Sequence, residues 1–242
     1  MTLLFSFAHP DDESFSGAGT AMKYAAAGAR IVLVTATLGE KGKCGDPPVC
    51  APEEIAATRE GELREASRII GFDALYLLGY QDQALGAAAP EEIRARLVRI
   101  IRQERPDVVF SFDPNGFNAH PDHVAISRFT ADAAAAAADP RWYRQAGEPH
   151  TVTRVLWTPP MPPWEGAKLP RLEDAPGADF LFDVSRWKDR RIAALRAHRT
   201  QHLSIDRYFF TQPDLDRILA TEIWRSGSGP MLRDRPAADL HV

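Results

Sequence analysis

The sequence predicts an α/β fold of the Rossmann-like, doubly wound type, with a mostly parallel sheet and a C-terminal capping region. Two observations predict it. Short apolar runs with few internal charges alternate with segments of helical period over the first 140 residues, as is typical of strands covered on both faces. Beyond residue 140, prolines crowd the chain and the alternation weakens. We therefore expect a single domain over residues 1–242, with a parallel core over 1–140 and a capping region over 141–242.

The elements follow one another in a regular order. Strands are expected at residues 3–8, 31–35, 74–78 and 108–112. Helices are expected around 16–28, 53–70 and 91–104, and the last two carry apolar stripes that end at Gly71 and before Pro106. A fourth helix is expected to begin near Pro121 and to run through the alanines that follow. This order implies right-handed crossovers and a parallel sheet.

The C-terminal third has weaker signals. We expect strands at 152–158 and 179–184, helices at 187–202 and 213–225, and loop in the proline-rich stretch between the two strands. Because no clean linker separates this part from the rest, we expect it to cover the sheet as a cap.

The composition excludes several kinds of partner. The chain has 242 residues, 45% of them hydrophobic and 26% charged, and its formal net charge is -4. Without a basic face for phosphates, nucleic acid is not an expected partner. No apolar stretch approaches the ~20 residues that span a bilayer, and the N-terminus lacks the features of a signal peptide, so we expect a cytoplasmic protein without a transmembrane segment. The sequence leaves a homo-oligomer open.

Two polar clusters follow the first and fourth expected strands. Ala-His-Pro-Asp-Asp-Glu occupies residues 8–13, and Asp-Pro-Asn-Gly-Phe-Asn-Ala-His-Pro-Asp-His occupies residues 113–123. In doubly wound sheets these two strands often lie side by side where the strand order reverses, and the crevice beyond their carboxyl ends is the usual ligand site. We therefore expect the two clusters to meet.

The residue types in these clusters suit a metal ion. Imidazole and carboxylate groups bind borderline divalent ions, and a catalytic zinc takes three protein ligands and leaves a position for water. His9 and Asp12 are three residues apart, as are His120 and His123, so four donors are available for three positions. Asp11 is a spare carboxylate that can take a proton from metal-bound water. Acidic residues at a helix start are also favoured by the helix dipole alone, so the prediction depends on both clusters occurring together.

At these residues the sequence resembles the PIG-L/LmbE-like family of metal-dependent N-acetylglucosaminyl deacetylases, whose members share both motifs. The resemblance continues through residues 37–42, 58–63 and 78–82, and extends more weakly to 188–194 and 198–201. An insert at 43–52, which would lie at the mouth of the site, departs from the family pattern. It holds Cys44 and Cys50, which we expect to be reduced thiols without a function.

The resemblance implies a role for each candidate residue. Three residues would bind the metal, namely His9, Asp12 and His123. Asp11 would be the general base, and Arg59 would reach substrate oxygens. His120 would stabilise the oxyanion or protonate the leaving amine, and Asp122 would orient His120. His198 is expected to pack or to cap its helix.

The sequence therefore predicts a hydrolase in which metal-bound water attacks an N-acetyl, or related N-acyl, group on a small-molecule amino-sugar conjugate. Zinc is the expected ion. Fe(II) stays open, because the metal that occupies a site often depends more on which metal is available in the cell than on the affinity of the site. Two alternatives remain. A non-haem iron oxygenase uses the same His/Asp/His set, and a non-catalytic module can bind a ligand in the same crevice. The identity of the sugar conjugate is not predicted.

Overall fold

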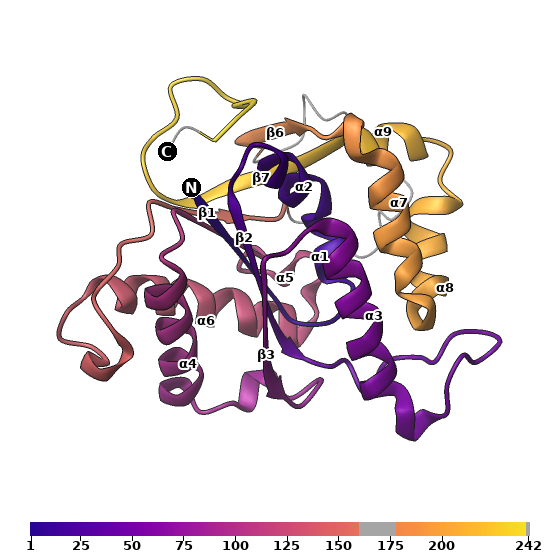
Figure 1. The fold of residues 1–242 in the computed structure, drawn as a ribbon, viewed down its shortest axis with the longest axis horizontal. Coiled ribbons are helices and arrows are strands. Elements are labelled where there is room, and N and C mark those ends of the chain that lie inside the picture. Colours follow the sequence, from indigo (N-terminus) through magenta and orange to yellow (C-terminus); the bar gives the residue numbers. More distant parts are fainter. Residues whose placement is uncertain (160–177, 241–242) are drawn as a thin grey trace.

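A computed structural model describes residues 1–159 and 178–240, which form one sheet flanked by helices (Figure 1). Within these ranges the sheet has seven strands in the order β3-β2-β1-β4-β5-β7-β6. The strands are β1 (Thr2–Phe7), β2 (Arg30–Thr37), β3 (Ala74–Tyr80), β4 (Val108–Ser111), β5 (Arg154–Trp157), β6 (Phe180–Asp183) and β7 (Thr221–Ser228). The helices are α1 (Asp12–Ser16), α2 (Ala18–Ala26), α3 (Ile55–Ile70), α4 (Pro90–Glu104), α5 (Gly116–Ala119), α6 (Pro121–Ala138), α7 (Lys188–Ala197), α8 (His202–Ile205) and α9 (Leu215–Ala220).

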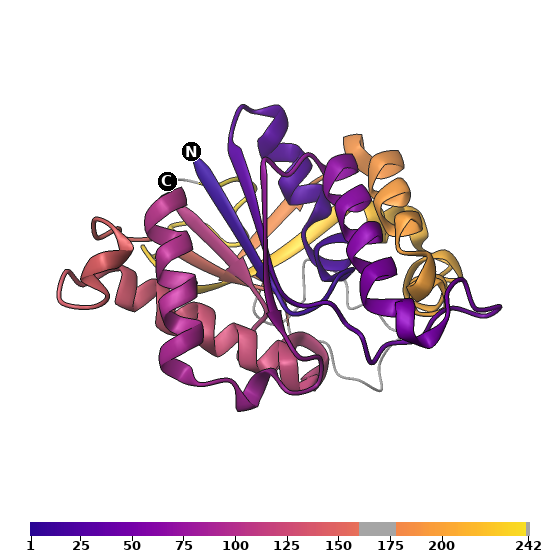
Figure 2. The same ribbon diagram turned by 60° about the horizontal axis from the view of Figure 1, so that its bottom comes forward.

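The predicted parallel sheet is confirmed. Strand β1 pairs in parallel with β2 on one side and with β4 on the other, so the strand order reverses between the first and fourth strands, as expected. Figure 2 shows α4 and α6 together on one face of the sheet and α3 and α7 on the other. Helix α3 ends as predicted, because Gly71 adopts a left-handed φ of 93°, which glycine tolerates without a steric cost. No helix among the described ranges has the length and apolarity needed to cross a membrane.

The C-terminal third does more than cap the sheet. Strand β5 continues the parallel part beside β4, and β7 and β6 extend the sheet in antiparallel fashion. The parallel part of the sheet therefore extends beyond residue 140, to β5. The two strands expected in this part are confirmed as β5 and β6, whereas the proline-rich stretch from 160 to 177, expected as loop, lies outside the described residues.

The helix expected at 213–225 is only half correct, since α9 stops at Ala220 and β7 follows directly. From Thr221 to Trp224, exposure alternates between partly buried and buried residues, which is the period of a strand. The buried members of this alternation are Glu222 and Trp224. Because the buried position 222 holds a glutamate, the alternation of apolar and polar residues that predicts a strand is absent from the sequence there.

Buried contacts tie β7 to the N-terminal part of the chain. The Glu222 carboxylate accepts the backbone N–H groups of Gly19 and Thr20, at 2.8 and 2.7 Å, and lies 3.1 Å from the guanidinium of Arg191. It therefore satisfies the first turn of α2, where N–H groups have no partner within the helix. The Trp224 ring meets Phe110 of β4 edge to face with centroids 4.7 Å apart. The C-terminal strands thus complete the core around the first helices.

Candidate metal centre

The two polar clusters meet at the carboxyl ends of β1 and β4, which are neighbouring strands. His9 follows the end of β1, and Asp12 opens α1. His120 caps the N-terminus of α6, and His123 lies in its first turn. The predicted convergence of residues more than a hundred positions apart is therefore present in the structure.

Three of the predicted donors face one another. The distance from His9 Nδ1 to His123 Nε2 is 3.2 Å, from His123 Nε2 to Asp12 Oδ1 it is 3.3 Å, and from His9 Nδ1 to Asp12 Oδ2 it is 3.6 Å. Ligands bonded to a tetrahedral zinc at about 2.0–2.1 Å are separated by about 3.3 Å. All three side chains are buried. The spacing of the donors therefore fits a small divalent ion.

The other ring nitrogen of each histidine has an acceptor, and this fixes which nitrogen carries the proton. His9 Nε2 lies 3.2 Å from both Asp82 Oδ1 and Asp122 Oδ2, and His123 Nδ1 lies 3.1 Å from the carbonyl oxygen of Gly116. In the neutral rings these nitrogens carry N–H groups, so the nitrogens that face Asp12 present lone pairs. Metal-binding histidines are held in the same way in other proteins. Three electron-pair donors converge on one point, which is the chemistry of a cation site.

The structure gives Asp122 a different contact from the expected one. Its carboxylate accepts the backbone N–H groups of Gln83 and Leu85, at 2.6 and 3.1 Å, and approaches His9. Only its backbone N–H contacts His120, at 3.2 Å from Nδ1. Orientation of His120 by Asp122 stays a prediction; in this structure the backbone N–H of Asp122 makes the contact and the carboxylate does not. The two backbone N–H groups that donate to the carboxylate belong to the loop after β3, whose course could not be predicted from the sequence.

Electrostatics in the cluster favour a negative Asp12 beside positive charge. Burial raises the pKa of Asp12, but His123 and His9 outweigh burial and hold that pKa well below its usual range. Burial lowers the pKa of His9, whereas its hydrogen bonds to Asp12, Asp122 and Asp82 raise that pKa well above the ordinary value. The site as a whole therefore attracts a cation.

Asp11 lies beside the donors and in an unusual backbone conformation. Its φ is 109° and its ψ is -28°, values that a residue with a Cβ adopts only under constraint from its surroundings. Burial raises the pKa of Asp11 to about 6, although Arg59, with Nη2 3.4 Å from Oδ1, opposes this rise. A carboxylate with a raised pKa is a better proton acceptor at neutral pH than an ordinary one.

Arg59 is buried, with 4% of its surface exposed, and its guanidinium contacts the protein itself. Nη1 donates to the carbonyl oxygen of Gly39 at 2.9 Å, and Nη2 donates to that of Pro10 and pairs with Asp11. These contacts hold the loop that carries Asp11. Contact of Arg59 with substrate oxygens stays a prediction.

His120 is half-buried and its ring lies close to the rings of His9 and His123. Its ring centroid lies 4.7 Å from that of His9 and 5.0 Å from that of His123. Because Nδ1 accepts the Asp122 N–H, the neutral ring carries its proton on Nε2. Burial, together with His9 and His123, lowers the pKa of His120. His120 is therefore a neutral N–H donor at the edge of the site, although its ring is also close enough to count among possible ligands.

Sequence reasoning missed the roles of Asp82 and Glu13. Asp82 lies 3.2 Å from His9 and also accepts the N–H of Lys41, at 3.0 Å, two residues before the expected insert. The carboxylate of Glu13 faces His198 rather than the metal donors. Both residues lie in stretches that resemble the family, but the spacing of residues along the sequence does not show that Asp82 contacts His9 or that Glu13 contacts His198. Cys44 and Cys50 in the insert are free, as expected.

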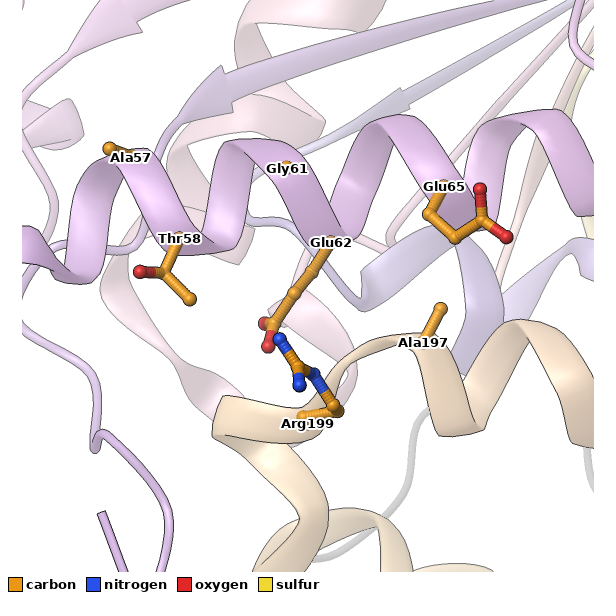
Figure 3. Close-up of a pocket in the computed structure, with 7 residues that line it drawn as sticks. All are labelled: Ala57, Thr58, Gly61, Glu62, Glu65, Ala197 and Arg199. Carbon is orange, nitrogen blue, oxygen red and sulfur yellow. The ribbon is translucent and has the colours of Figure 1, made fainter. Parts of the chain in front are cut away.

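A separate groove of about 460 Å³ lies between α3 and the turn that follows α7 (Figure 3). Its lining residues are Ala57, Thr58, Gly61, Glu62, Glu65, Ala197 and Arg199. None of the seven candidate site residues lines it. The groove therefore belongs to the packing of two helices and not to the metal centre.

Comparison with known proteins agrees with the geometry. A deacetylase from Streptomyces griseus, named for 1D-myo-inositol 2-acetamido-2-deoxy-alpha-D-glucopyranoside, is 34% identical, with 92% of this chain and 82% of the relative covered. The N,N'-diacetylchitobiose deacetylase of Pyrococcus horikoshii has the same fold, with a TM-score of 0.73, 22% identity, and 93% and 83% of the two chains covered.

A third similar structure has a different activity. The 4-carboxy-2-hydroxymuconate hydratase GalB from Pseudomonas putida gives a TM-score of 0.74 at 17% identity, with 96% of this chain and 98% of that chain covered. The fold therefore does not decide the chemistry, and the residues of the site must do so. The family model described as PIG-L, GlcNAc-PI de-N-acetylase, matches residues 4–134, the part that holds every candidate residue. The chain belongs to the PIG-L family.

Proposed function

We propose that the chain is a zinc-dependent hydrolase that removes the N-acetyl group from a small amino-sugar conjugate. One observation carries the proposal: His9 Nδ1 and His123 Nε2 lie 3.2 Å from each other and 3.6 and 3.3 Å, respectively, from the two oxygens of the Asp12 carboxylate, beside the carboxylate of Asp11. Membership of the PIG-L family supports the choice of an N-acetyl amide.

His9, Asp12 and His123 would hold the ion. When bound, a divalent ion supplies Lewis acidity that polarises the acetyl carbonyl and makes water acidic near neutral pH. Asp11 accepts the proton of the attacking water, because its carboxylate lies in the same loop as two of the ligands and has a pKa of about 6. Arg59 holds this carboxylate through its contact with Oδ1. The water oxygen then forms a bond with the acetyl carbon.

His120 acts on the oxygen of the acetyl group. Its neutral ring carries an N–H group at Nε2, because Nδ1 accepts the Asp122 N–H. An N–H donor aimed at a developing oxyanion stabilises the transition state, and loss of one such donor costs roughly 3–4 kcal/mol in other enzymes. His120 therefore fits the oxyanion role better than the role of a cationic acid, since its pKa is lowered.

The carbon–nitrogen bond breaks when the sugar nitrogen receives a proton. Asp11 holds the proton taken from water and returns it to this nitrogen, so that one water is consumed and acetate and a free amine are released. A single carboxylate can serve both steps because its raised pKa lies close to neutral pH, where it can both accept and release a proton.

The substrate class follows from the relatives. The Streptomyces griseus relative and a probable deacetylase from Bacillus anthracis are named for N-acetylglucosamine joined to inositol and to L-malate, respectively. We therefore propose an N-acetylglucosaminide with a small polar aglycone as the substrate of this chain.

The test combines metal content with amine release. The purified protein is stripped with a chelator, reloaded with zinc or with Fe(II), and assayed on a panel of N-acetylglucosaminides for free amine and for oxygen uptake. We expect amine release that depends on the metal, and no oxygen uptake. Oxygen uptake without amine release would instead favour the iron oxygenase.

Asp11→Ala separates metal binding from catalysis. We expect this variant to retain one metal ion per chain and to lose about 10²- to 10⁴-fold in kcat, the range for a lost general base. Unchanged turnover would remove Asp11 from its role as base.

A further inference from the structure

Two buried residues, Glu13 and His198, lie behind Asp11. Glu13 has 1% of its surface exposed and His198 has none, and Glu13 Oε1 lies 2.7 Å from His198 Nε2. The same oxygen accepts the hydroxyl of Ser14 at 2.6 Å. The other oxygen, Oε2, accepts the backbone N–H of Asp11 at 3.0 Å. A chain of hydrogen bonds therefore runs from the end of α7 to the backbone of Asp11.

The backbone of Asp11 requires such support. Its φ of 109° is sterically unfavourable for a residue with a Cβ, and a residue keeps such a conformation only when its surroundings fix it. The carbonyl oxygen accepts the N–H groups of Ser14 and Phe15, at 2.9 and 3.0 Å, and Arg59 holds the side chain. Glu13 supplies the remaining contact, to the N–H group.

Burial of Glu13 and His198 costs free energy, because both polar side chains lose their contact with water. A carboxylate removed from water needs charged or hydrogen-bonding partners, and His198 is the ionisable one among the three groups that contact the Glu13 carboxylate. The Nδ1 atom of His198 is buried and has no hydrogen-bond partner among the residues that the structure describes. Neither residue is in the set of donors that face the metal position. Incompletely satisfied polar groups of this kind are often found where function requires them.

We propose that Glu13 and His198 are positioning residues that hold Asp11 in the conformation from which it acts as a base. The inference rests on the proposed function, because it assigns the pair to the loop of the proposed base. It also gives the C-terminal third of the chain a part in the site, since His198 stands 185 residues after Glu13. The hydrogen bonds of the pair go to Asp11 and Ser14 and not to the proposed metal donors, so its effect on the reaction passes through Asp11.

The experiment compares two substitutions of one residue. His198→Leu removes the N–H donor to Glu13, whereas His198→Gln keeps an N–H donor in a side chain of similar length. We expect His198→Leu to lower kcat by about 10- to 100-fold, as for other groups that orient active-site residues, with KM and zinc content unchanged. His198→Gln should retain at least about a third of the wild-type kcat.

Thr200→Val is the matched control. Thr200 lies in the same turn and bonds a different buried carboxylate, with its hydroxyl 2.6 Å from Glu62 Oε2. It therefore reports the cost of loosening this turn without touching Glu13. We expect its kcat to stay within about twofold of wild type. An equal loss of kcat in His198→Leu and Thr200→Val would overturn the proposal, because general loosening would then explain both.

A readout independent of turnover follows the Asp11 amide by NMR in protein labelled with ¹⁵N-aspartate. An amide that donates to a carboxylate has its proton resonance at low field. We expect this resonance to move upfield in His198→Leu and to stay in place in His198→Gln and Thr200→Val. An unmoved resonance in His198→Leu would overturn the proposal even if no test substrate is hydrolysed. Absence of turnover in the wild-type protein, by contrast, would count against the proposed function alone.

Discussion

Asp82→Asn tests whether the carboxylates around His9 determine the affinity of the metal site. In the wild type, Asp82 Oδ1 lies 3.2 Å from His9 Nε2, and Oδ2 accepts the N–H of Lys41 at 3.0 Å. An amide has one oxygen, so it can satisfy only one of these two N–H groups. If the oxygen stays with Lys41, the NH₂ group faces His9 Nε2 and favours the ring form with its proton on Nδ1. That proton would occupy the lone pair that faces the metal position.

The expected magnitude follows from the number of carboxylates. Asp122 Oδ2 also lies 3.2 Å from His9 Nε2, so the single substitution leaves one acceptor in place. Loss of a group that orients a metal ligand typically costs 10- to 100-fold in affinity, or about 1.4–2.7 kcal/mol. We expect Asp82→Asn near the lower limit and the double variant Asp82→Asn/Asp122→Asn near the upper one.

The assay is a competition for zinc between each variant and a chromophoric chelator. Asp73→Asn is the control, because Asp73 also accepts a backbone N–H, that of Ile31 at 2.8 Å, but lies at the opposite end of the strands. Its zinc affinity should equal that of the wild type. If Asp82→Asn and the double variant both bind zinc as tightly as Asp73→Asn does, the reasoning about the proton on His9 is refuted.

Three further predictions follow from other contacts. Gly116→Ala should weaken zinc binding in the same competition assay, because its φ is +70° and a Cβ there would come within 2.9 Å of His123 Cβ and 2.7 Å of the Val124 nitrogen; unchanged affinity would show that the loop adjusts freely. In denaturant titrations Glu222→Ala should lower the free energy of unfolding by about 3–5 kcal/mol, since it leaves Arg191 buried without a carboxylate to offset its charge. Glu65→Ala, which breaks an exposed pair, should leave the free energy of unfolding nearly unchanged. Removal of the metal by a chelator should abolish amine release while the circular dichroism of the sheet persists, because the core is apolar and closed; loss of the fold on chelation would contradict this.

The first half of the fold could be predicted because its strands are short apolar runs buried on both faces. Leu3, Val32 and Val109 lie in such runs and are all fully buried. The order of strands and helices then fixed the sheet, and the position of the two clusters at neighbouring strand ends followed from it. The last strand escaped prediction because Glu222 occupies a core position, where its partner is a helix N-terminus far away in the sequence.

The candidate site could be predicted as a set of residues but not as a network of contacts. The motifs contain His9, Asp12 and His123, and the structure brings these three together. Which carboxylate faces which ring nitrogen depends on the course of loops that residue spacing does not predict, such as the loop whose N–H groups contact the Asp122 carboxylate. The pairing of Glu13 with His198 was beyond sequence reasoning for the same reason.

The dependence of the first helices on the last part of the chain bears on the order of assembly during synthesis. Asp11 and the three residues that would bind zinc all lie within the first 123 positions. Glu13 and the N–H groups of Gly19 and Thr20, however, meet their partners at residues 198 and 222. A nascent chain of 140 residues thus contains all three proposed metal-binding residues. The segment that carries His9 and Asp12, however, still lacks its contacts with residues 198 and 222. Contacts of such long sequence separation slow folding, and residues up to 222 must leave the ribosome before the loop that carries Asp11 and the start of α2 have all of these contacts.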